Sequence, residues 1–215
     1  NWRRVAIDFA TLLANPEPSG TGVDLSNVEN AFVIEVTGGS AEFYLDNMFI
    51  THACAASEEC NATVKTQRFI DIDYELVWSD EFDGTSLSLD NWQYETGYGN
   101  NGWGNDEWQL YTSNSANVAV ENGNLRISAQ CANPSNCGKR NGTVTSARIN
   151  TLNKFAFKYG KVEARIKPPV GKGTWSAFWM LGKQFPFTGW PFSGEIDIVE
   201  IFTGQSNEFT THFTM

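Results

Sequence analysis

Apolar and polar residues alternate with a period of two in many short runs of this chain, as expected for β-strands. In the run KVEARIK at 161–167, we expect the apolar side chains of Val162, Ala164 and Ile166 to face a core. We expect its charged side chains to face outward: Lys161, Glu163, Arg165 and Lys167. Gly, Asn, Asp and Pro separate the runs, and helical periodicity is almost absent, so the pattern predicts an all-β fold.

The segment NVAVENGNLRIS at 117–128 predicts a hairpin, because Asn-Gly at 122–123 is a strong signal for a two-residue turn. The residues expected to pair across this turn are Val118 and Val120 with Leu125 and Ile127. Many short strands joined by such turns are typical of two sheets packed face to face. We therefore expect a two-sheet β-sandwich.

A polar stretch of small residues at 53–74 predicts a linker between two parts of the chain. Three strand-like runs precede it: WRRVAIDF, AFVIEVT and AEFYLDNMFI. Three strands are too few for an independent sandwich, so we interpret residues 1–52 as the end of a separate β-domain. Residues 75–215 would then form the N-terminal part of a second domain that is truncated at its C-terminal end. The first residue, Asn1, and the strand-like ending FTTHFTM indicate a fragment cut at both ends.

The composition of the chain limits the classes of molecule that it is expected to bind. The chain has 215 residues, 41% of them hydrophobic and 13% aromatic, which is enough for a substantial core. Its net charge of −10 argues against nucleic acids and anionic membranes, both of which attract basic surfaces. No apolar run approaches the roughly 18 residues of a membrane span, and no signal peptide is visible. A neutral partner fits this composition best.

The four cysteines form two closely spaced pairs, Cys54 with Cys60 and Cys131 with Cys137. Neither spacing matches a zinc ribbon or a redox CxxC motif. Two short disulfide loops in an exported protein fit the pattern, and free thiols are the alternative.

The run GEIDIVEIF at 194–202 places Glu195, Asp197 and Glu200 among isoleucine and valine. Strict alternation would turn Glu200 into the core, where an unpaired carboxylate is costly. A one-residue β-bulge between Asp197 and Glu200 would bring all three acids to one face, and bulges are common beside active sites. The sequence therefore predicts a bulged strand with an acidic face.

Three interpretations of this acidic face remain open. Clustered carboxylates push their pKa values apart, so one can be ionised while another is protonated, as glycoside hydrolysis requires. Glu195 and Glu200 could flank a glycosidic bond, with Asp197 hydrogen-bonded between them, and a separation of about 5–5.5 Å would indicate a retaining reaction. The alternatives are a calcium site and a solvated edge strand.

Aromatic residues cluster just before the acids. In GTWSAFWML at 173–181, Trp175, Ala177 and Trp179 should project from one face of a strand and Phe178 and Met180 from the other. Tryptophan offers a flat apolar face and an N–H donor to a sugar. The plainer interpretation is that these tryptophans belong to the core.

A second candidate region is the Gly- and Asn-rich stretch GYGNNGWGNDEWQLYT at 97–112, which carries Trp103 and Trp108. Long ordered loops with amides and aromatics are often functional. The alternative is a flexible surface loop.

Taken in order, several segments resemble the family 16 glycoside hydrolases, and most closely the bacterial laminarinases (endo-β-1,3-glucanases). They are LVWSDEFDG, NWQYETGYGNNGWGNDEWQLYT, NVAVENGNLRISA, TSARINT, FAFKYGKVEARIKPPVGKGTWSAFWMLG and GWPFSGEIDIVE. The resemblance covers about residues 76–200, which makes it far more specific than the acid motif alone. It implies a β-jelly-roll with a concave glycan cleft.

By this resemblance, Glu195 is the nucleophile, Asp197 the assisting acid and Glu200 the general acid/base of an E-x-D-x-x-E motif. The chemistry would need no cofactor. The matching positions for glucan contacts are Trp175, Trp179, Trp190, Trp103, Asn101 and Arg148. His212 is a weaker match to a family histidine, offset by about two residues in the alignment.

Two departures from the family follow. Its catalytic domain usually continues well beyond the acid motif, whereas this chain stops at Met215, so the fragment by itself could be inactive. Many relatives also hold a structural Ca²⁺, for which Glu81 and the carbonyl of Gly123 match, but a late aspartate ligand has no counterpart here.

Residues 1–52 resemble the last strands of a galactose-binding-like carbohydrate-binding module.

We therefore expect a retaining endo-β-1,3-glucanase that is monomeric and is secreted, periplasmic or on the cell surface. The nearest alternative is a β-1,3-1,4-glucanase (lichenase), although the two residues between Asp197 and Glu200 favour the laminarinases. Agarase or carrageenase activity fits less well, partly because an acidic protein repels sulfated glycans. A non-hydrolytic β-glucan-binding lectin of the same fold is the alternative from a different class.

Overall fold

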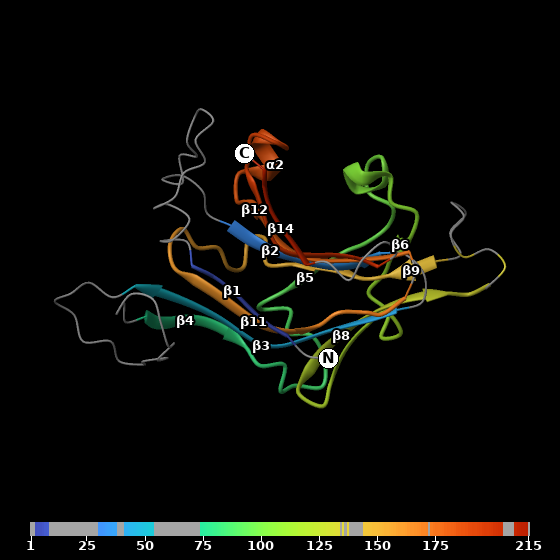
Figure 1. The fold of residues 1–215 in the computed structure, drawn as a ribbon, viewed down its shortest axis with the longest axis horizontal. Helices are drawn as coiled ribbons and strands as arrows, with labels where there is room; N and C mark the ends of the chain where they lie inside the picture. The colour runs from blue at the N-terminus through green and yellow to red at the C-terminus, as the bar shows by residue number, and fades with distance from the viewer. Residues whose placement is uncertain are drawn as a thin grey trace.

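In the computed structural model, strands form two sheets that face each other (Figure 1). The structure describes residues 3–8, 30–37, 41–53, 74–133, 135, 137, 144–171, 173–203 and 209–214. The six-stranded sheet runs in the order β14 (Phe209–Thr214), β13 (Glu195–Thr203), β12 (Thr174–Gly182), β2 (Asn30–Thr37), β10 (Arg148–Asn150), β5 (Gln93–Glu95). All of its neighbouring strands are antiparallel.

The eight-stranded sheet forms the second layer. Its main order is β1 (Arg3–Asp8), β11 (Lys161–Lys167), β3 (Ala41–Ala53), β8 (Asn124–Cys131), β9 (Val144–Ser146), β6 (Leu110–Tyr111). Two further strands attach to it, with β4 (Tyr74–Asp80) on β3 and β7 (Val118–Glu121) on β8. Among the described residues, two short helical segments lie in the connections. They are η2 (Gly102–Asp106), which is non-helical at Trp103 and Gly104, and the α-helix α2 (Phe185–Thr188). Neither they nor any other helix in the described ranges could cross a membrane.

The core fills the space between the two layers, as the alternating pattern predicts. Buried apolar residues come from strands of both sheets, among them Leu125, Ile127, Val162, Ile166, Phe178, Met180, Ile196 and Ile198. Trp92 closes the core near the end of β4, where its indole Nε1 donates to Oδ2 of Asp80 at 2.8 Å. The two-layer arrangement confirms the predicted all-β sandwich.

The predicted hairpin is confirmed in its register and in the position of its turn. Val118 pairs with Ile127 and Val120 pairs with Leu125. The connecting turn has φ of 53° at Asn122 and 69° at Gly123, the two positive angles that a type I′ turn requires. A short disulfide between Cys131 and Cys137 follows β8 and confirms the second predicted pair. Cys54 and Cys60 lie outside the described residues.

The prediction for the polar face of β11 is wrong in part. Val162, Ala164 and Ile166 are fully buried, as expected, but Lys161 and Glu163 are buried as well. Arg165 and Lys167, expected to face out, are half-buried. Alternation reports which residues share a face but not what covers that face, and β11 is an interior strand between β1 and β3.

Burial of Lys161 and Glu163 is tolerated because the two charges form an ion pair with each other. The Lys161 ammonium also lies 5.2 Å from the ring centroid of Tyr74, where a cation–π contact is favourable. The paired charges therefore occupy a buried position without an isolated ion.

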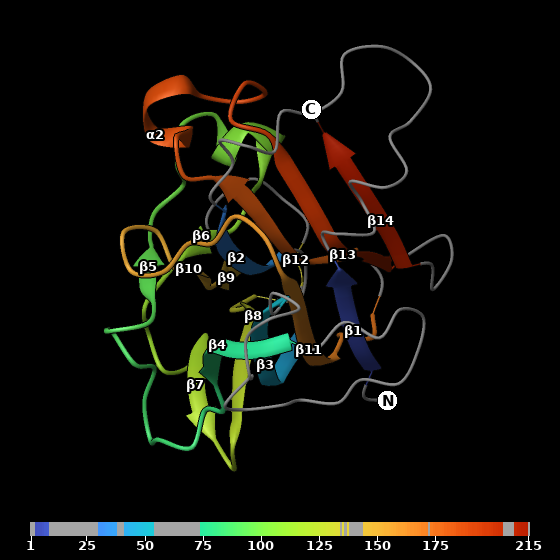
Figure 2. The same ribbon diagram turned by 90° about the vertical axis from the view of Figure 1, so that its left-hand side faces the viewer.

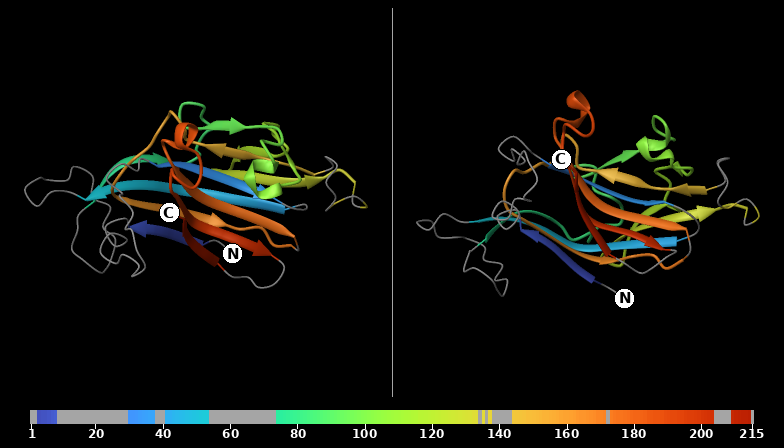
Figure 3. Two further views of the ribbon diagram at one scale, coloured as in Figure 1. Left: turned by 90° about the horizontal axis from the view of Figure 1, so that it is seen from above. Right: turned by 45° about the horizontal axis from the view of Figure 1, so that its top comes forward.

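The strands before the predicted boundary do not form a separate sheet. β2 lies between β12 and β10, and β3 lies between β11 and β8 (Figure 3). The expected unit at residues 1–52 is thus joined to the strands that follow the linker. The physical reason is edge satisfaction, because β2 and β3 supply backbone donors and acceptors to strands that would otherwise present open edges. The origin of residues 1–52 in a carbohydrate-binding module stays a prediction.

Candidate active site

The acidic strand β13 contains the predicted bulge. Against β12, Val199 pairs with Phe178 but Asp197 pairs with Trp179, so Ile198 is the extra residue. Against β14, the register also shifts between Asp197, opposite His212, and Glu200, opposite Thr210. The bulge lets Ile196, Ile198, Val199 and Ile201 all join the core. Glu195, Asp197 and Glu200 consequently share the opposite face.

The three acids are held by a chain of side-chain contacts. Glu195 is hydrogen-bonded to Asp197 and to Trp190. At the other end of the motif, Trp175 Nε1 donates to Oε1 of Glu200 at 3.1 Å. Each acid of the predicted triad therefore has a fixed neighbour.

Burial raises the pKa of Glu195 above its ordinary value, because a charged carboxylate loses hydration there. The negative charge of Glu200 acts in the same direction. The hydrogen bonds from Asp197 and Trp190 and the positive charge of Arg148 oppose the shift and hold the pKa of Glu195 down. Glu195 thus sits where substrate or neighbouring charges can change its protonation, which is typical of functional carboxylates.

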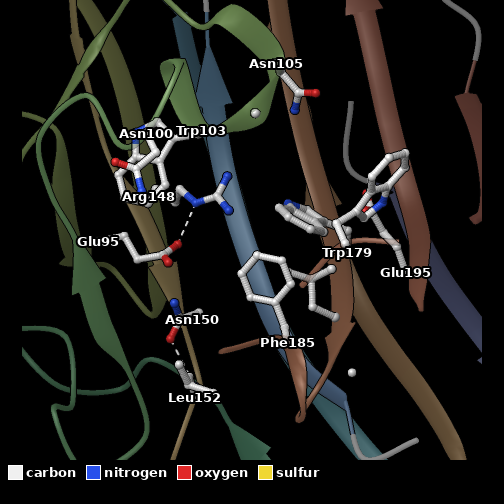
Figure 4. A pocket seen from close by; sticks show the side chains of 14 residues that line it. Glu95, Asn100, Trp103, Asn105, Arg148, Asn150, Leu152, Trp179, Phe185 and Glu195 are labelled. Carbon is white, nitrogen blue, oxygen red and sulfur yellow. Dashed lines mark hydrogen bonds and ion pairs between the residues drawn. The ribbon is translucent and has the colours of Figure 1, made fainter. Parts of the chain in front are cut away.

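A cavity of about 540 Å³ opens beside these acids on the six-stranded sheet (Figure 4). Its floor is lined from strands β5, β10, β12 and β13, and residues of the η2 and α2 segments line its sides. Both segments stand out from the same side of the six-stranded sheet in Figure 1. Its lining residues are Glu95, Asn100, Trp103, Gly104, Asn105, Arg148, Asn150, Leu152, Trp179, Leu181, Gly182, Phe185, Trp190 and Glu195. The lining combines four aromatic rings with a few polar groups, as carbohydrate and other small-ligand sites do.

Arg148 occupies the centre of the cavity floor. Its guanidinium carbon lies 4.9 Å from the ring centroids of both Trp103 and Trp179, so the cation sits between two indoles. Its Nε donates to Oε2 of Glu95 at 2.5 Å. These contacts hold the guanidinium in one place and position the two tryptophan rings relative to each other.

Trp179 carries a buried hydrogen-bond donor at this site. Its side chain is buried, yet its Nε1 has no hydrogen-bond partner among the described residues. Ala177, Trp179 and Leu181 form a small cluster on the cavity face of β12, whereas Phe178 and Met180 join the main core, as the alternation predicts. The Nε1 atom itself is closed to solvent, so the cavity wall is formed by other atoms of this side chain.

The η2 segment is shaped by left-handed backbone positions, which bring Trp103 back over the sheet. Asn101 and Trp103 have φ of 51° and 56°. Glu107 fixes the end of the segment, because its Oε2 accepts hydrogen bonds from Gln109 Nε2 and from the Tyr111 hydroxyl, both at 2.7 Å. Tyr111 in turn contacts Trp103 edge to face, with ring centroids 5.8 Å apart. The loop is thus an ordered wall of the cavity.

Most residues singled out from the sequence meet at this site. Trp103, Arg148, Trp179, Trp190 and Glu195 line the cavity, and Asp197, Glu200 and Trp175 continue the site along the strands. Asn101 does not line the cavity, but its neighbour Asn100 does. His212 faces Asp197 in strand register.

The sequence reasoning missed several lining residues, notably Glu95, Asn105, Asn150, Leu152 and Phe185. The QYE run of β5 offered no motif, and its link to the site is long-range: Glu95 contacts Arg148 53 positions away. For Phe185, the closely spaced aromatics in KQFPFTGWPF were a usable signal.

The described residues do not by themselves complete the expected calcium site. Calcium takes about six to eight oxygen ligands. Glu81 and the Gly123 carbonyl would supply two, and the described ranges contain no cluster of three or more His, Cys, Asp or Glu residues. A calcium ion at Glu81 and Gly123 therefore stays a prediction.

Comparison with known proteins agrees with this geometry. The family model for "Glycosyl hydrolases family 16" matches residues 104–214, which include the whole acidic strand. The chain belongs to glycosyl hydrolase family 16. This confirms the family inferred from the motifs and, with it, the jelly-roll fold.

Two of the relatives that match this chain are named glucan endo-1,3-beta-glucosidases. A glucan endo-1,3-beta-glucosidase A1 of Niallia circulans is 44% identical over 133 residues, covering 58% of this chain and 20% of the relative. A glucan endo-1,3-beta-glucosidase of Cryptopygus antarcticus is 45% identical over 131 residues, covering 60% of this chain and 46% of the relative. The crystal structure of a laminarinase from Flavobacterium sp. UMI-01 superposes with a TM-score of 0.55 at 40% identity, covering 65% of this chain and 57% of that one. The chain thus spans less than half the length of these two curated relatives.

Proposed function

We propose that the protein is a retaining endo-β-1,3-glucanase. The observation that carries this proposal is the shared face of Glu195, Asp197 and Glu200 on a bulged strand beside an aromatic-lined cavity. The names of the relatives support the linkage, because both matched glucanases are described as endo-1,3-β enzymes. A neutral glucan also suits a protein of net charge −10.

In the first half of the reaction, ionised Glu195 attacks the anomeric carbon and forms a glycosyl ester, while Glu200 gives its proton to the departing glycosidic oxygen. In the second half, Glu200 takes a proton from water as the water oxygen attacks the anomeric carbon. The ester bond then breaks, and Glu195 leaves as a carboxylate. Asp197 holds Glu195 in place through their hydrogen bond.

The cavity residues have distinct tasks in this proposal. The rings of Trp103, Trp179 and Trp190 present apolar faces to sugar rings. Arg148 donates to sugar hydroxyls from the cavity floor. Trp175 orients Glu200 rather than lining the cavity. The protein acts outside the cell or in the periplasm, in line with its disulfide.

The deciding experiment compares the full-length protein with its Glu195→Gln variant for reducing-sugar release from laminarin, lichenan, agarose and carrageenan. We expect release from laminarin that disappears in the variant. Preferential release from lichenan would instead indicate a β-1,3-1,4-glucanase. Laminarin binding without release of any sugar would indicate a glucan-binding lectin and would exclude the proposed chemistry.

The roles of the two glutamates are separable. Glu200→Gln should lose most activity on natural glucan but much less on an aryl glycoside whose leaving group needs no protonation. Glu195→Gln should lose activity on both, because the covalent intermediate cannot form. Equal losses on both substrates in the Glu200 variant would contradict the assignment.

A further inference from the structure

The connection between β12 and β13 carries an unusual number of exposed aromatic side chains. Residues 183–194 read KQFPFTGWPFSG and contain a single charged residue, Lys183. Phe187 is 86% exposed and Phe192 is 85% exposed. The helix α2 within this connection stands out from the six-stranded sheet (Figure 2). Several large apolar side chains exposed on one short connection make it a candidate interaction surface.

The backbone of this connection is held by its own hydrogen bonds. Gly189 N donates to the Phe185 carbonyl at 2.9 Å, and Ser193 N donates to the Gly189 carbonyl at 3.0 Å. At the base, Gly182 N donates to the Gly194 carbonyl at 3.2 Å. A Cβ at Gly182 would lie 2.0 Å from the Ser193 carbonyl oxygen, so the two ends pack too closely for a side chain. The exposed phenylalanines are therefore presented from a fixed frame.

The exposed surface is continuous along the chain with the cavity. Phe185 and Trp190 line the cavity, and Phe187 and Phe192 follow each of them by two residues without lining it. Trp190 is also hydrogen-bonded to Glu195. Phe187 and Phe192 therefore belong to the same short, hydrogen-bonded connection as two aromatic residues of the cavity.

We propose that Phe187 and Phe192 form an aromatic platform that binds β-glucan outside the cavity and retains the enzyme on long or insoluble chains. This inference rests on the proposed function, since it takes the cavity ligand to be a neutral glucan. Sugar rings present apolar C–H faces that pack on aromatic rings and need no charge. Anionic lipids and sulfated glycans are disfavoured, because the protein is itself strongly negative.

The test measures depletion of the full-length protein from solution by particles of insoluble linear β-1,3-glucan. Binding is measured in the Glu195→Gln background, so that hydrolysis does not erode the particles. We expect the double variant Phe187→Ala/Phe192→Ala to bind the particles at least fivefold more weakly. In the background that keeps Glu195, its kcat/KM on a short soluble β-1,3-gluco-oligosaccharide should stay within twofold, because neither residue lines the cavity.

The matched control is Leu89→Ala/Val170→Ala, which removes two other exposed apolar side chains, 57% and 89% exposed. This control should leave particle binding unchanged. Equal binding by the platform variant and its parent would overturn the platform. A dimer by light scattering that the platform variant converts to monomer, or binding to neutral phosphatidylcholine vesicles that it abolishes, would assign the surface to a second copy or to lipid and would also overturn it.

Failure of the platform can be told apart from failure of the proposed function. If the parent protein binds glucan through Phe187 and Phe192 but hydrolyses none, the platform is supported and the proposed glucanase activity is excluded. Hydrolysis of soluble glucan with platform-independent binding would do the reverse. A parent that neither binds nor cleaves β-1,3-glucan would exclude both.

Discussion

Trp175 and Glu200, 25 positions apart, are joined by a hydrogen bond of 3.1 Å from the indole Nε1 to the carboxylate Oε1. The pairing of β12 with β13 brings the two residues together, since Trp175 lies opposite Phe202, two positions after Glu200. The rings of Trp175 and Phe202 stack with their centroids 4.8 Å apart. One face of Trp175 is thus packed while its N–H holds Glu200. The indole positions the group that we propose as general acid/base.

Trp175→Phe should therefore lower kcat/KM on laminarin by roughly tenfold, the value of one charge-assisted hydrogen bond. Phenylalanine keeps a ring for stacking on Phe202 but has no donor for Glu200. Steady-state kinetics on laminarin and on an activated aryl glycoside provide the measurement, and the loss should be smaller on the aryl substrate. If only Trp175→Ala, and not Trp175→Phe, reduces activity, ring packing rather than the hydrogen bond matters.

The pH dependence of activity should report the environment of Glu195. Burial raises the pKa of Glu195, so the acidic limb of kcat/KM should lie above the ordinary glutamate value of 4.5. The positive charge of Arg148 holds this pKa down, and Arg148→Gln should move the limb further toward alkaline pH. Arg126→Gln, on the other sheet, is the control and should leave the limb in place. An unmoved limb in Arg148→Gln would show that this charge does not reach Glu195.

The same pKa shift predicts a change in stability with a definite sign. An acid whose pKa is raised in the folded protein stabilises the fold below its unfolded pKa, and this contribution is lost as pH rises through the folded pKa. Glu195→Gln removes the titration, so the variant should gain stability relative to the parent protein at neutral pH. Urea unfolding of both proteins at pH 4 and pH 7 measures the difference. A larger gain at pH 4 than at pH 7 would contradict the assigned direction.

Glu107 should hold the η2 wall of the cavity in place. Glu107→Ala would leave the hydroxyl of Tyr111 and the amide of Gln109 buried without this acceptor, at a cost of about 3 kcal/mol in the free energy of unfolding. Because Tyr111 contacts Trp103, we also expect a severalfold rise in KM with a smaller change in kcat. Glu107→Gln retains an acceptor oxygen and should be milder in both measurements. If the variant is destabilised but its KM is unchanged, the η2 wall does not contribute to substrate binding.

The Cys131–Cys137 disulfide should stabilise the end of β8 modestly. The bond closes a short loop of sequence separation 6, for which loop-closure entropy predicts about 2 kcal/mol. Cys131→Ser/Cys137→Ser should lose about this amount in urea unfolding while its glucanase activity at low temperature is retained. Equal stability of the variant and its parent under oxidising conditions would show that the loop is already ordered without the bond.

Local features of this protein could be read from sequence because local chemistry decides them. Alternation identified the apolar residues of β11 and β12 that lie in the core, and Asn122-Gly123 specified its own turn. The bulge in β13 was also predictable, since only an added residue reconciles a buried apolar face with three acids on the other. Together with the motif resemblance, these features identified the family and the acidic strand.

Only the tertiary structure decided which distant residues meet and which faces are covered. The ion pair of Glu95 with Arg148 depends on the pairing of β5 with β10, and the burial of Lys161 depends on both neighbours of β11. The placement of β2 and β3 inside the two sheets likewise follows from strand edges far along the chain. Alternation along a strand shows which of its side chains share a face. Long-range strand pairing decides which other residues cover that face. Those covering residues determine burial, the charge environment and the walls of the cavity.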